Sequence, residues 1–206
     1  MRQKGARNVD VNIFLFPNFE TLDIFGPIEV LGRVAEYRLR YYSLEGQNIV
    51  SAQGTEIVTQ PLHMANPKGI FGLPGGRGTR PLAVDKKFMQ QLLPYVNACT
   101  YCLSICTGAA VLAAGGVLDG RRAISNKKAF VWVKSTGSKV KWEPQARWCR
   151  DGKFYTAAGV SAGIDMALGF VADCFGRACA ETIARDMEYV WNDDMTKDIF
   201  AVPENK

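Results

Sequence analysis

The sequence predicts an α/β protein with a doubly wound, mostly parallel sheet and helices on both faces. Apolar, strand-like runs alternate with helix-like runs along almost the whole chain, a pattern typical of parallel strands joined by crossover helices. The 206 residues suffice for one domain with a sizeable core. An apolar run at 101–105 passes into an alanine-rich run at 109–114 with almost no loop. Since sites in such sheets lie beyond the carboxyl ends of the strands, we expect the functional site at this junction.

The first half of the chain alternates clearly. Residues 11–16 form a continuous apolar run, which predicts a strand ending in a Pro-Asn turn. The next helix is expected to carry Pro27 in its first turn, where the missing N–H costs nothing. The other expected elements are a strand at 38–44, a hairpin of 49–52 and 56–58, a strand at 70–73 and a helix through 88–93.

The second half begins with the strand at 101–105 and the helix at 109–114, closed by the glycine-rich turn 115–120. Residues 142–148 and 154–157 are further strand candidates, followed by an apolar helix at 164–175 and an amphipathic helix at 178–191. We therefore expect one domain over residues 1–206, with its core at about 11–192 and a loosely held tail after 198.

Composition favours an ordinary globular protein, with 48% hydrophobic and 22% charged residues. No apolar run is long enough to span a bilayer, and the N-terminus lacks the apolar core of a signal peptide, so we expect a cytoplasmic protein with no membrane partner. The net charge of +5 is spread out, and clusters such as 127–128 and 134–141 are expected to form solvated faces. Without interleaved aromatic residues they do not predict a nucleic-acid site.

The six cysteines are expected to be reduced thiols in that compartment. Cys99 and Cys102 form one C-x-x-C, but no second pair stands at zinc-ligand spacing, so we expect two core thiols and no metal site. His63 is the single histidine and is expected in a loop far from Cys106. A Cys/His catalytic pair is therefore not expected.

Cys106 stands where the strand meets the helix and is the best candidate nucleophile. Ser104 and Gly108 flank it at two residues on either side, and such small neighbours allow a sharp strand-to-helix turn that exposes one side chain. A thiol at the start of a helix is expected to have a lowered pKa and to form thiolate. The alternative is an inert, buried cysteine at the end of a strand.

Asp23 is the candidate proton partner, because its neighbours Leu22 and Ile24 are too apolar for an ordinary surface carboxylate. Near a thiol in an apolar pocket its pKa would be raised, so that it could donate a proton at neutral pH. The alternative is an N-cap for the helix that follows.

Gly75 and Gly76 end a strand, and their bare backbone N–H groups could approach a substrate or an oxyanion closely; the alternative is a plain turn. The N–H of Thr107, directly after the nucleophile, would face the same anion. The Thr107 hydroxyl would add a hydrogen bond or cap the helix.

These motifs together resemble the ThiJ/PfpI superfamily from residue 11 to about residue 191. The matching segments are Thr-Leu-Asp-Ile-Phe-Gly-Pro around Asp23, Leu-Pro-Gly-Gly-Arg-Gly-Thr-Arg around Gly76, Ile-Cys-Thr-Gly-Ala around Cys106 and Ala-Ala-Gly-Val-Ser-Ala-Gly around Gly159. The resemblance implies a flavodoxin-like fold related to that of class I glutamine amidotransferases. It also implies a homodimer with the site near the interface. Phe19, Phe25 and Phe130 offer mild support, since one core need not hide them all.

Within that superfamily the motifs look most like those of isonitrile hydratases and of the amidase-like domain of AraC-type regulators. The isonitrile hydratase resemblance assigns the functional roles to Cys106, Thr107 and Asp23. It implies attack of the Cys106 thiolate on the terminal isonitrile carbon, proton delivery by Asp23, and release of an N-substituted formamide without metal or organic cofactor. The regulator interpretation is limited, because the chain stops before any helix-turn-helix domain.

Asn126 departs from this pattern, because close relatives often carry a histidine at that pocket-facing position. It is either a neutral replacement in a structural turn or a sign of a changed pocket. Two other functions therefore stay open beside the isonitrile hydratase: an amidase or glyoxalase-like enzyme on the same scaffold, and a non-enzymatic redox or stress sensor that oxidises at Cys106.

Overall fold

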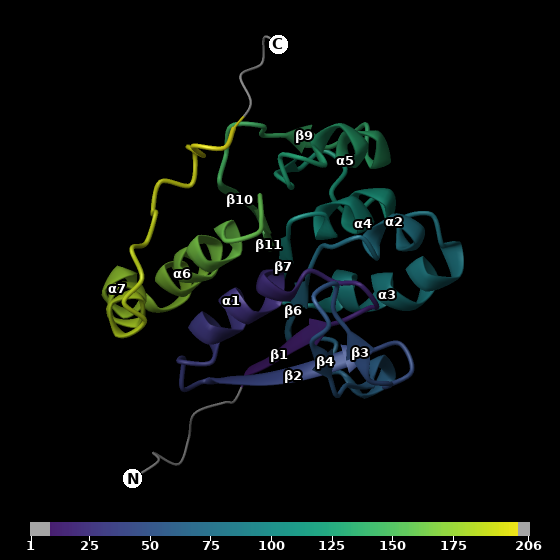
Figure 1. Ribbon diagram of the computed structural model, residues 1–206, viewed down its shortest axis with the longest axis horizontal. Helices are drawn as coiled ribbons and strands as arrows, with labels where there is room; N and C mark the ends of the chain where they lie inside the picture. The colour runs from purple at the N-terminus through teal and green to yellow at the C-terminus, as the bar shows by residue number, and fades with distance from the viewer. Residues whose placement is uncertain (1–8, 202–206) are drawn as a thin grey trace.

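A seven-stranded sheet forms the centre of the computed structural model, which describes residues 9–201 (Figure 1). The strand order is β10-β11-β7-β6-β1-β2-β5, and every neighbouring pair is parallel except β10 with β11. This confirms the predicted mostly parallel, doubly wound sheet. The strands are β1 (Val9–Phe14), β2 (Tyr37–Ser43), β5 (Gln60–Pro61), β6 (Ile70–Leu73), β7 (Tyr101–Ile105), β10 (Trp148–Asp151) and β11 (Phe154–Ala157).

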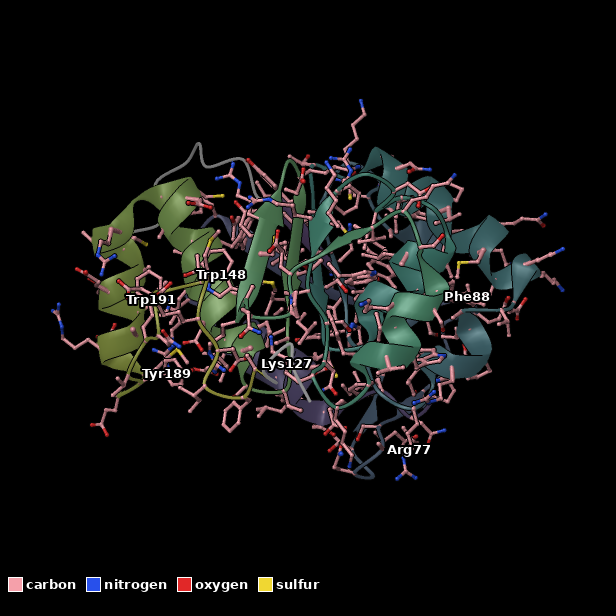
Figure 2. The ribbon with its side chains drawn as sticks, turned by 90° about the horizontal axis from the view of Figure 1, so that it is seen from above. Arg77, Phe88, Lys127, Trp148, Tyr189 and Trp191 are labelled. Carbon is pink, nitrogen blue, oxygen red and sulfur yellow. The ribbon has the colours of Figure 1, made fainter. Side chains whose placement is uncertain are left out.

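Helices cover both faces of this sheet, as the two layers in Figures 1 and 2 show. One layer contains α1 (Thr21–Leu31), α6 (Ala162–Phe175) and α7 (Arg177–Asp186). The other contains α3 (Lys86–Ala98) and α4 (Gly108–Ala114), with α2 (Thr79–Leu82) and α5 (Phe130–Thr136) packed against α4. Because both faces are covered, strands such as β6 are buried along their whole length and read as continuous apolar runs.

The order of the strands reverses at β1, because β2 is added on one side of β1 and β6 on the other. In a parallel sheet the carboxyl ends of all strands meet at one edge, and the crevice at such a switch point is where ligands bind. The segments that follow β1, β6, β7 and β11 therefore converge. They carry Asp23, Gly75, Cys106 and Gly159, respectively.

Two small sheets lie outside the central one. The predicted hairpin is confirmed as β3 (Ile49–Val50) paired with β4 (Glu56–Ile57), and it hydrogen-bonds to the β1–α1 loop through Asn18 and Phe19. The predicted strand at 142–148 is wrong. Trp142 lies in β9 (Lys141–Trp142), which pairs with β8 (Arg122–Ala123), whereas Trp148 begins β10. A loop with Pro144 separates the two, because a proline cannot donate to a strand ladder.

Pro27 lies in the middle of α1, not in its first turn as expected. The helix begins six residues earlier, at Thr21, with Glu20 as its N-cap. Both Ile24 and Pro27 are buried, so packing of this face offsets the hydrogen bond that the proline lacks.

The predictions for the last third were less accurate. Helix α5 was not foreseen, and α7 ends at Asp186, five residues before the predicted end. The chain beyond α7 is held as far as Asp198, which is buried beside Lys127 and Arg147, so Lys127 does not belong to the solvated face that we expected. Of the predicted tail, residues 202–206 lie outside the described residues. No helix within residues 9–201 has the length and apolar character needed to cross a membrane.

Candidate active site

Cys106 occupies a sharp turn between β7 and α4. Its φ of 55° lies in the left-handed region, which costs a non-glycine residue roughly 1–2 kcal/mol. Two hydrogen bonds hold this backbone: the Cys106 N–H donates to the Ala157 carbonyl at 3.0 Å, and the Ser125 hydroxyl donates to the Cys106 carbonyl at 2.6 Å. The predicted strand-to-helix turn is therefore present, and the thiol is held at the edge of the sheet.

Glycines enclose the cysteine because no side chain would fit. A β-carbon on Gly159 would lie 2.5 Å from Cβ and 3.1 Å from Sγ of Cys106. A β-carbon on Gly75 would lie 2.9 Å from Cβ of Cys106 and would collide with the Thr107 backbone nitrogen. Both contacts are closer than real β-carbons allow, so these glycines let β6, β7 and β11 meet around the thiol.

Asp23 is fully buried in the first turn of α1. Its Oδ2 accepts a 2.8 Å hydrogen bond from the Gly75 N–H, whereas Oδ1 has no hydrogen-bond partner in the described part of the chain. Asp23 is not the N-cap, so that alternative is wrong; Glu20 holds the position. The N-cap interpretation failed because the helix starts earlier than the proline suggested.

The pKa of Asp23 is raised to about 8, mainly because the carboxyl is buried. The negative charge of Glu20 also raises this pKa, while the Gly75 hydrogen bond and the Cys106 thiol lower it. No cation is among these influences. The raised pKa that we expected is therefore present, and the carboxyl can both hold and release a proton near neutral pH.

The pKa of the Cys106 thiol is also raised, contrary to the expected thiolate. Burial is the largest cause and the charge of Asp23 the second, and both outweigh the lowering effects of the Thr107 backbone and hydroxyl. Since α4 has only seven residues and the thiol is 6% exposed, the helix end cannot compensate for lost hydration. The charge of Asp23 raises the pKa of the thiol, and the thiol lowers that of Asp23, so the protonation of each group affects the other.

Thr107 ties the nucleophile turn to the loop after β6. Its Oγ1 accepts a 3.0 Å hydrogen bond from the Gly76 N–H and lies 3.0 Å from the Thr79 hydroxyl. The N–H groups of Gly75 and Gly76 are thus already engaged, by Asp23 and Thr107. In this arrangement the two glycines position those side chains, and neither N–H is open to an oxyanion as we had expected.

A cavity of about 470 Å³ opens directly over this turn. Cys106, Thr107, Gly76 and Asn126 all line it, whereas Asp23 and Gly75 do not and lie behind the thiol. The Asn126 Oδ1 accepts a 3.0 Å hydrogen bond from the Ala129 N–H, so this residue is both a turn cap and a cavity residue.

The sequence patterns did not mark all of the cavity wall. Trp132 lines it but belongs to the unforeseen α5, and Arg80 lines it from α2. The Gly-Arg-Gly-Thr-Arg segment after β6 was the available signal for Arg80, since a charged residue so close to a strand end at the site edge faces the crevice.

The other expected thiols and the histidine lie elsewhere. Cys99 and Cys102 are both buried, as predicted, at the opposite end of β7 from the cavity. His63 is exposed in a short 3₁₀ helix (Leu62–Met64) after β5 and does not line the cavity. Within residues 9–201, no group of three or more His, Cys, Asp or Glu side chains is arranged to hold a metal ion.

Comparison with known proteins gives one consistent family. A model of the DJ-1/PfpI family matches residues 9–173. An isonitrile hydratase from Pseudomonas putida is 28% identical over 182 residues, which cover 88% of this chain and 78% of that protein. The crystal structure of a ThiJ/PfpI family protein from Pseudomonas syringae is 25% identical, with a TM-score of 0.82 over 92% of this chain and 81% of that one. An AraC family transcriptional regulator from Pseudomonas putida, 20% identical, shares the fold with a TM-score of 0.74 over 87% of this chain and 99% of that one.

Proposed function

The chain belongs to the DJ-1/PfpI family, and we propose that it is a cysteine-dependent enzyme that hydrates small isonitriles or a related carbon electrophile. The observation that carries the proposal is the pair of Asp23 and Cys106. A buried carboxyl with one unpartnered oxygen sits behind a thiol that lines a cavity. The similarity to an isonitrile hydratase suggests the substrate class. The pair supplies a nucleophile and a proton carrier, which are the two groups that this reaction needs.

In the first step, Asp23 Oδ1 takes the proton from the Cys106 thiol, and Sγ forms a bond to the terminal isonitrile carbon. The same proton then passes from Oδ1 to that carbon. The product is a thioimidate, R–N=CH–S–Cys106, which contains every atom of the isonitrile and the thiol. A carboxyl with a pKa near 8 suits this relay, because it is closer to the thiol in basicity than an ordinary aspartate and so takes the thiol proton at a smaller cost.

In the second step, water replaces the enzyme. The water oxygen bonds to the thioimidate carbon, and one water proton reaches the nitrogen through Asp23. The C–S bond then breaks, the remaining proton returns to Sγ, and R–NH–CHO leaves. The sum of both steps is isonitrile plus water to N-substituted formamide. No electrons are gained or lost, so the reaction requires no cofactor.

The test is turnover of a small isonitrile, followed by formamide formation, with the wild type beside Cys106→Ala and Asp23→Asn. We expect formamide from the wild type and none above background from either variant. Cys174→Ala is the matched control, because Cys174 is the exposed cysteine, and we expect it to keep full activity. Formamide formation that survives Cys106→Ala would disprove the proposal.

A panel of other substrates separates the alternatives that share the scaffold. An amidase would release ammonia or an amine from a carboxamide, and a glyoxalase-like enzyme would convert a 2-oxoaldehyde to a 2-hydroxy acid. A redox sensor would show peroxide-dependent oxidation of Cys106 with no product formed from any of these substrates. Each result would replace the hydratase assignment while keeping Cys106 as the reactive group.

The proposal includes a homodimer in the cytoplasm, where a reduced thiol persists. Phe19 is fully buried in the core and Phe130 is half-buried, so these two do not support an interface. Leu22 and Phe25 do, since both are about two-fifths exposed on α1, beside Asp23. We expect a dimer by sedimentation, and we expect Phe25→Glu to shift it toward the monomer.

A further inference from the structure

The cavity over Cys106 carries an excess of positive charge. Arg77, Arg80 and Lys128 line it, and Glu20 is the one acidic residue among the described residues of its wall. Among the described residues, none of the three cations lies within 4.0 Å of a carboxylate. A low-dielectric cleft lined by one sign of charge concentrates ligands of the opposite sign.

Elsewhere in the molecule, several surface arginines do find carboxylates. Arg33 pairs with Glu29, Arg38 pairs with Asp10, and Arg177 pairs with two acids. Other exposed cations, such as Lys134, also have no carboxylate within 4.0 Å among the described residues, but Arg77, Arg80 and Lys128 differ from them because they line the cavity. Such charges are available to a ligand.

Arg80 is held in place at the wall of the cavity, and its guanidinium N–H groups remain free to bind a ligand. Its guanidinium carbon lies 4.3 Å from the centre of the Trp132 ring, a stacked cation–π contact. Stacking restricts the side chain but leaves the N–H groups at the guanidinium edge free, and they donate no hydrogen bond to any described residue. This is the pre-organised fork that binds a carboxylate through two parallel hydrogen bonds.

Lys128 faces the same cavity from the segment that leads into α5, close in sequence to Asn126. Arg77 differs, because its side chain projects outward at the edge of the molecule in Figure 2. We therefore assign direct contact to Arg80 and Lys128, and attraction from a distance to Arg77.

We propose that the substrate carries a carboxylate, which Arg80 and Lys128 bind while the electrophilic carbon reaches Cys106. This inference rests on the proposed function and names its substrate class: a small isonitrile or related electrophile that bears a carboxylate. The cavity of about 470 Å³ has room for such a molecule.

Alkylation of Cys106 tests the inference without turnover. Iodoacetate and iodoacetamide react at the same kind of carbon and differ in one group, a carboxylate or a neutral amide. The ratio of their rate constants at Cys106, measured by peptide mass spectrometry, does not depend on how much of the thiol is ionised. The exposed Cys174 provides the reference ratio within the same protein.

We expect the iodoacetate-to-iodoacetamide ratio at Cys106 to exceed that at Cys174 by roughly tenfold, the effect of about one charge-assisted hydrogen bond. Arg80→Gln and Lys128→Gln should each remove most of this preference. Lys134→Gln is the matched control: this exposed lysine on α5 does not line the cavity, and its loss changes the net charge equally. Equal ratios at the two cysteines, or a preference that survives Arg80→Gln, would overturn the inference.

A turnover experiment then distinguishes failure of the inference from failure of the proposed function. Isocyanoacetate and isocyanoacetamide differ by the same exchange of carboxylate for amide. Faster turnover of isocyanoacetate, lost in Arg80→Gln, supports both proposals. Turnover of both compounds at equal rates supports the hydratase and removes the carboxylate preference. Turnover of neither, with the alkylation preference intact, removes the hydratase and keeps a carboxylate-binding nucleophile.

Discussion

Two buried aspartates, Asp23 and Asp165, show opposite ways of placing a carboxyl group in the core. Both are completely buried. Asp165 Oδ2 accepts from the Arg147 Nε at 2.6 Å, and its Oδ1 accepts from the Tyr189 hydroxyl and the Asn192 N–H, each at 3.0 Å. Asp23 receives one backbone hydrogen bond and faces a thiol. One carboxylate is fully satisfied and the other is left half satisfied.

The fully hydrogen-bonded Asp165 stabilises the fold, whereas the half-satisfied Asp23 stays available for proton transfer. The Asp165 cluster fastens the chain after α7 to α6 and to Arg147, directly before β10, and Figure 2 shows Tyr189 and Trp191 lying along α6 and α7 with Trp148 close by. Asp23 accepts only the hydrogen bond from Gly75 among the described residues. Its raised pKa shows that the ionised carboxylate lowers the free energy of unfolding. A buried acid without a cation is unfavourable for stability, and such groups cluster at functional sites.

The largest expected effect is the loss of activity when the reactive aspartate, Asp23, is replaced. Asp23→Asn keeps the shape and the acceptor for the Gly75 N–H but cannot carry the proton. We expect the rate of formamide formation to fall by roughly 10²–10⁴, the usual contribution of a positioned acid–base group. Circular dichroism should show an unchanged fold. A variant that keeps more than about a tenth of the activity would leave Asp23 without the proposed role.

Asp165→Asn tests the structural aspartate, because it leaves Arg147 with Asp198, at 3.5 Å, as its one carboxylate among the described residues. Removing one partner of a buried ion pair costs about 3–5 kcal/mol, and we expect the lower end because Asp198 remains. Denaturant unfolding measures it. The control is Glu29→Gln, which breaks the exposed ion pair with Arg33, with an expected cost below about 1 kcal/mol. Equal losses in the two variants would refute the contrast.

The pH dependence of the unfolding free energy is a further test of the role of Asp23. The pKa of Asp23 is raised from 3.8 to about 8 in the folded protein, so the folded state holds this proton more tightly than the unfolded chain does. The stability due to this group is complete below about pH 4 and is lost, by roughly 1.4 kcal/mol for each pH unit, as the pH rises toward 8. Asp23→Asn should therefore be more stable than the wild type at pH 8 by a few kcal/mol. Near pH 4 the difference in unfolding free energy should vanish, and a constant difference at both pH values would contradict this account.

Activity should follow the same titration in the opposite sense. The proposed mechanism needs the pair of Asp23 and Cys106 with one proton, so kcat/KM should rise about tenfold for each pH unit below 8 and level off above it. Alkylation of Cys106 by iodoacetamide should instead follow the thiol, whose pKa is raised, so its rate should keep rising above pH 8 in the wild type. In Asp23→Asn the alkylation profile should move to lower pH, because the negative charge that raises the thiol pKa is gone. An unmoved profile would show that the two groups titrate independently.

Strong local patterns were enough to predict the centre of the fold. The strands at 70–73, 101–105 and 154–157 have the predicted bounds, because parallel strands covered on both faces are unbroken apolar runs between glycines and polar residues. Elements whose bounds depend on tertiary packing were missed. Helix α5 lacks any capping side chain at its N-terminus, and α1 extends across Pro27 because its buried face packs against α6.

At the site, the residue types were predictable, and so was the pKa shift of Asp23, but the pKa shift of Cys106 was not. The flanking Ser104 and Gly108 indicated the turn at Cys106, and the apolar neighbours of Asp23 indicated a buried acid. Burial of the thiol depends on how tightly Gly75 and Gly159 pack around it, which no local pattern encodes. The sign of the Cys106 pKa shift was therefore missed, while the sign for Asp23 followed from its surroundings.

The smallest expected effect concerns Thr107, which joins the reactive turn to the structural loop. Thr107→Val keeps the shape but leaves the Gly76 N–H without its acceptor, at an expected cost of about 1–3 kcal/mol in unfolding free energy. Thr107→Ser keeps the hydroxyl and should restore most of it. The hydroxyl also lowers the thiol pKa, so the alkylation profile of Cys106 in Thr107→Val should move to higher pH, opposite to that of Asp23→Asn. Thr107 would be a purely structural residue if Thr107→Val lost stability with no movement of that profile, because the hydrogen bond to Gly76 would then account for all of its effect.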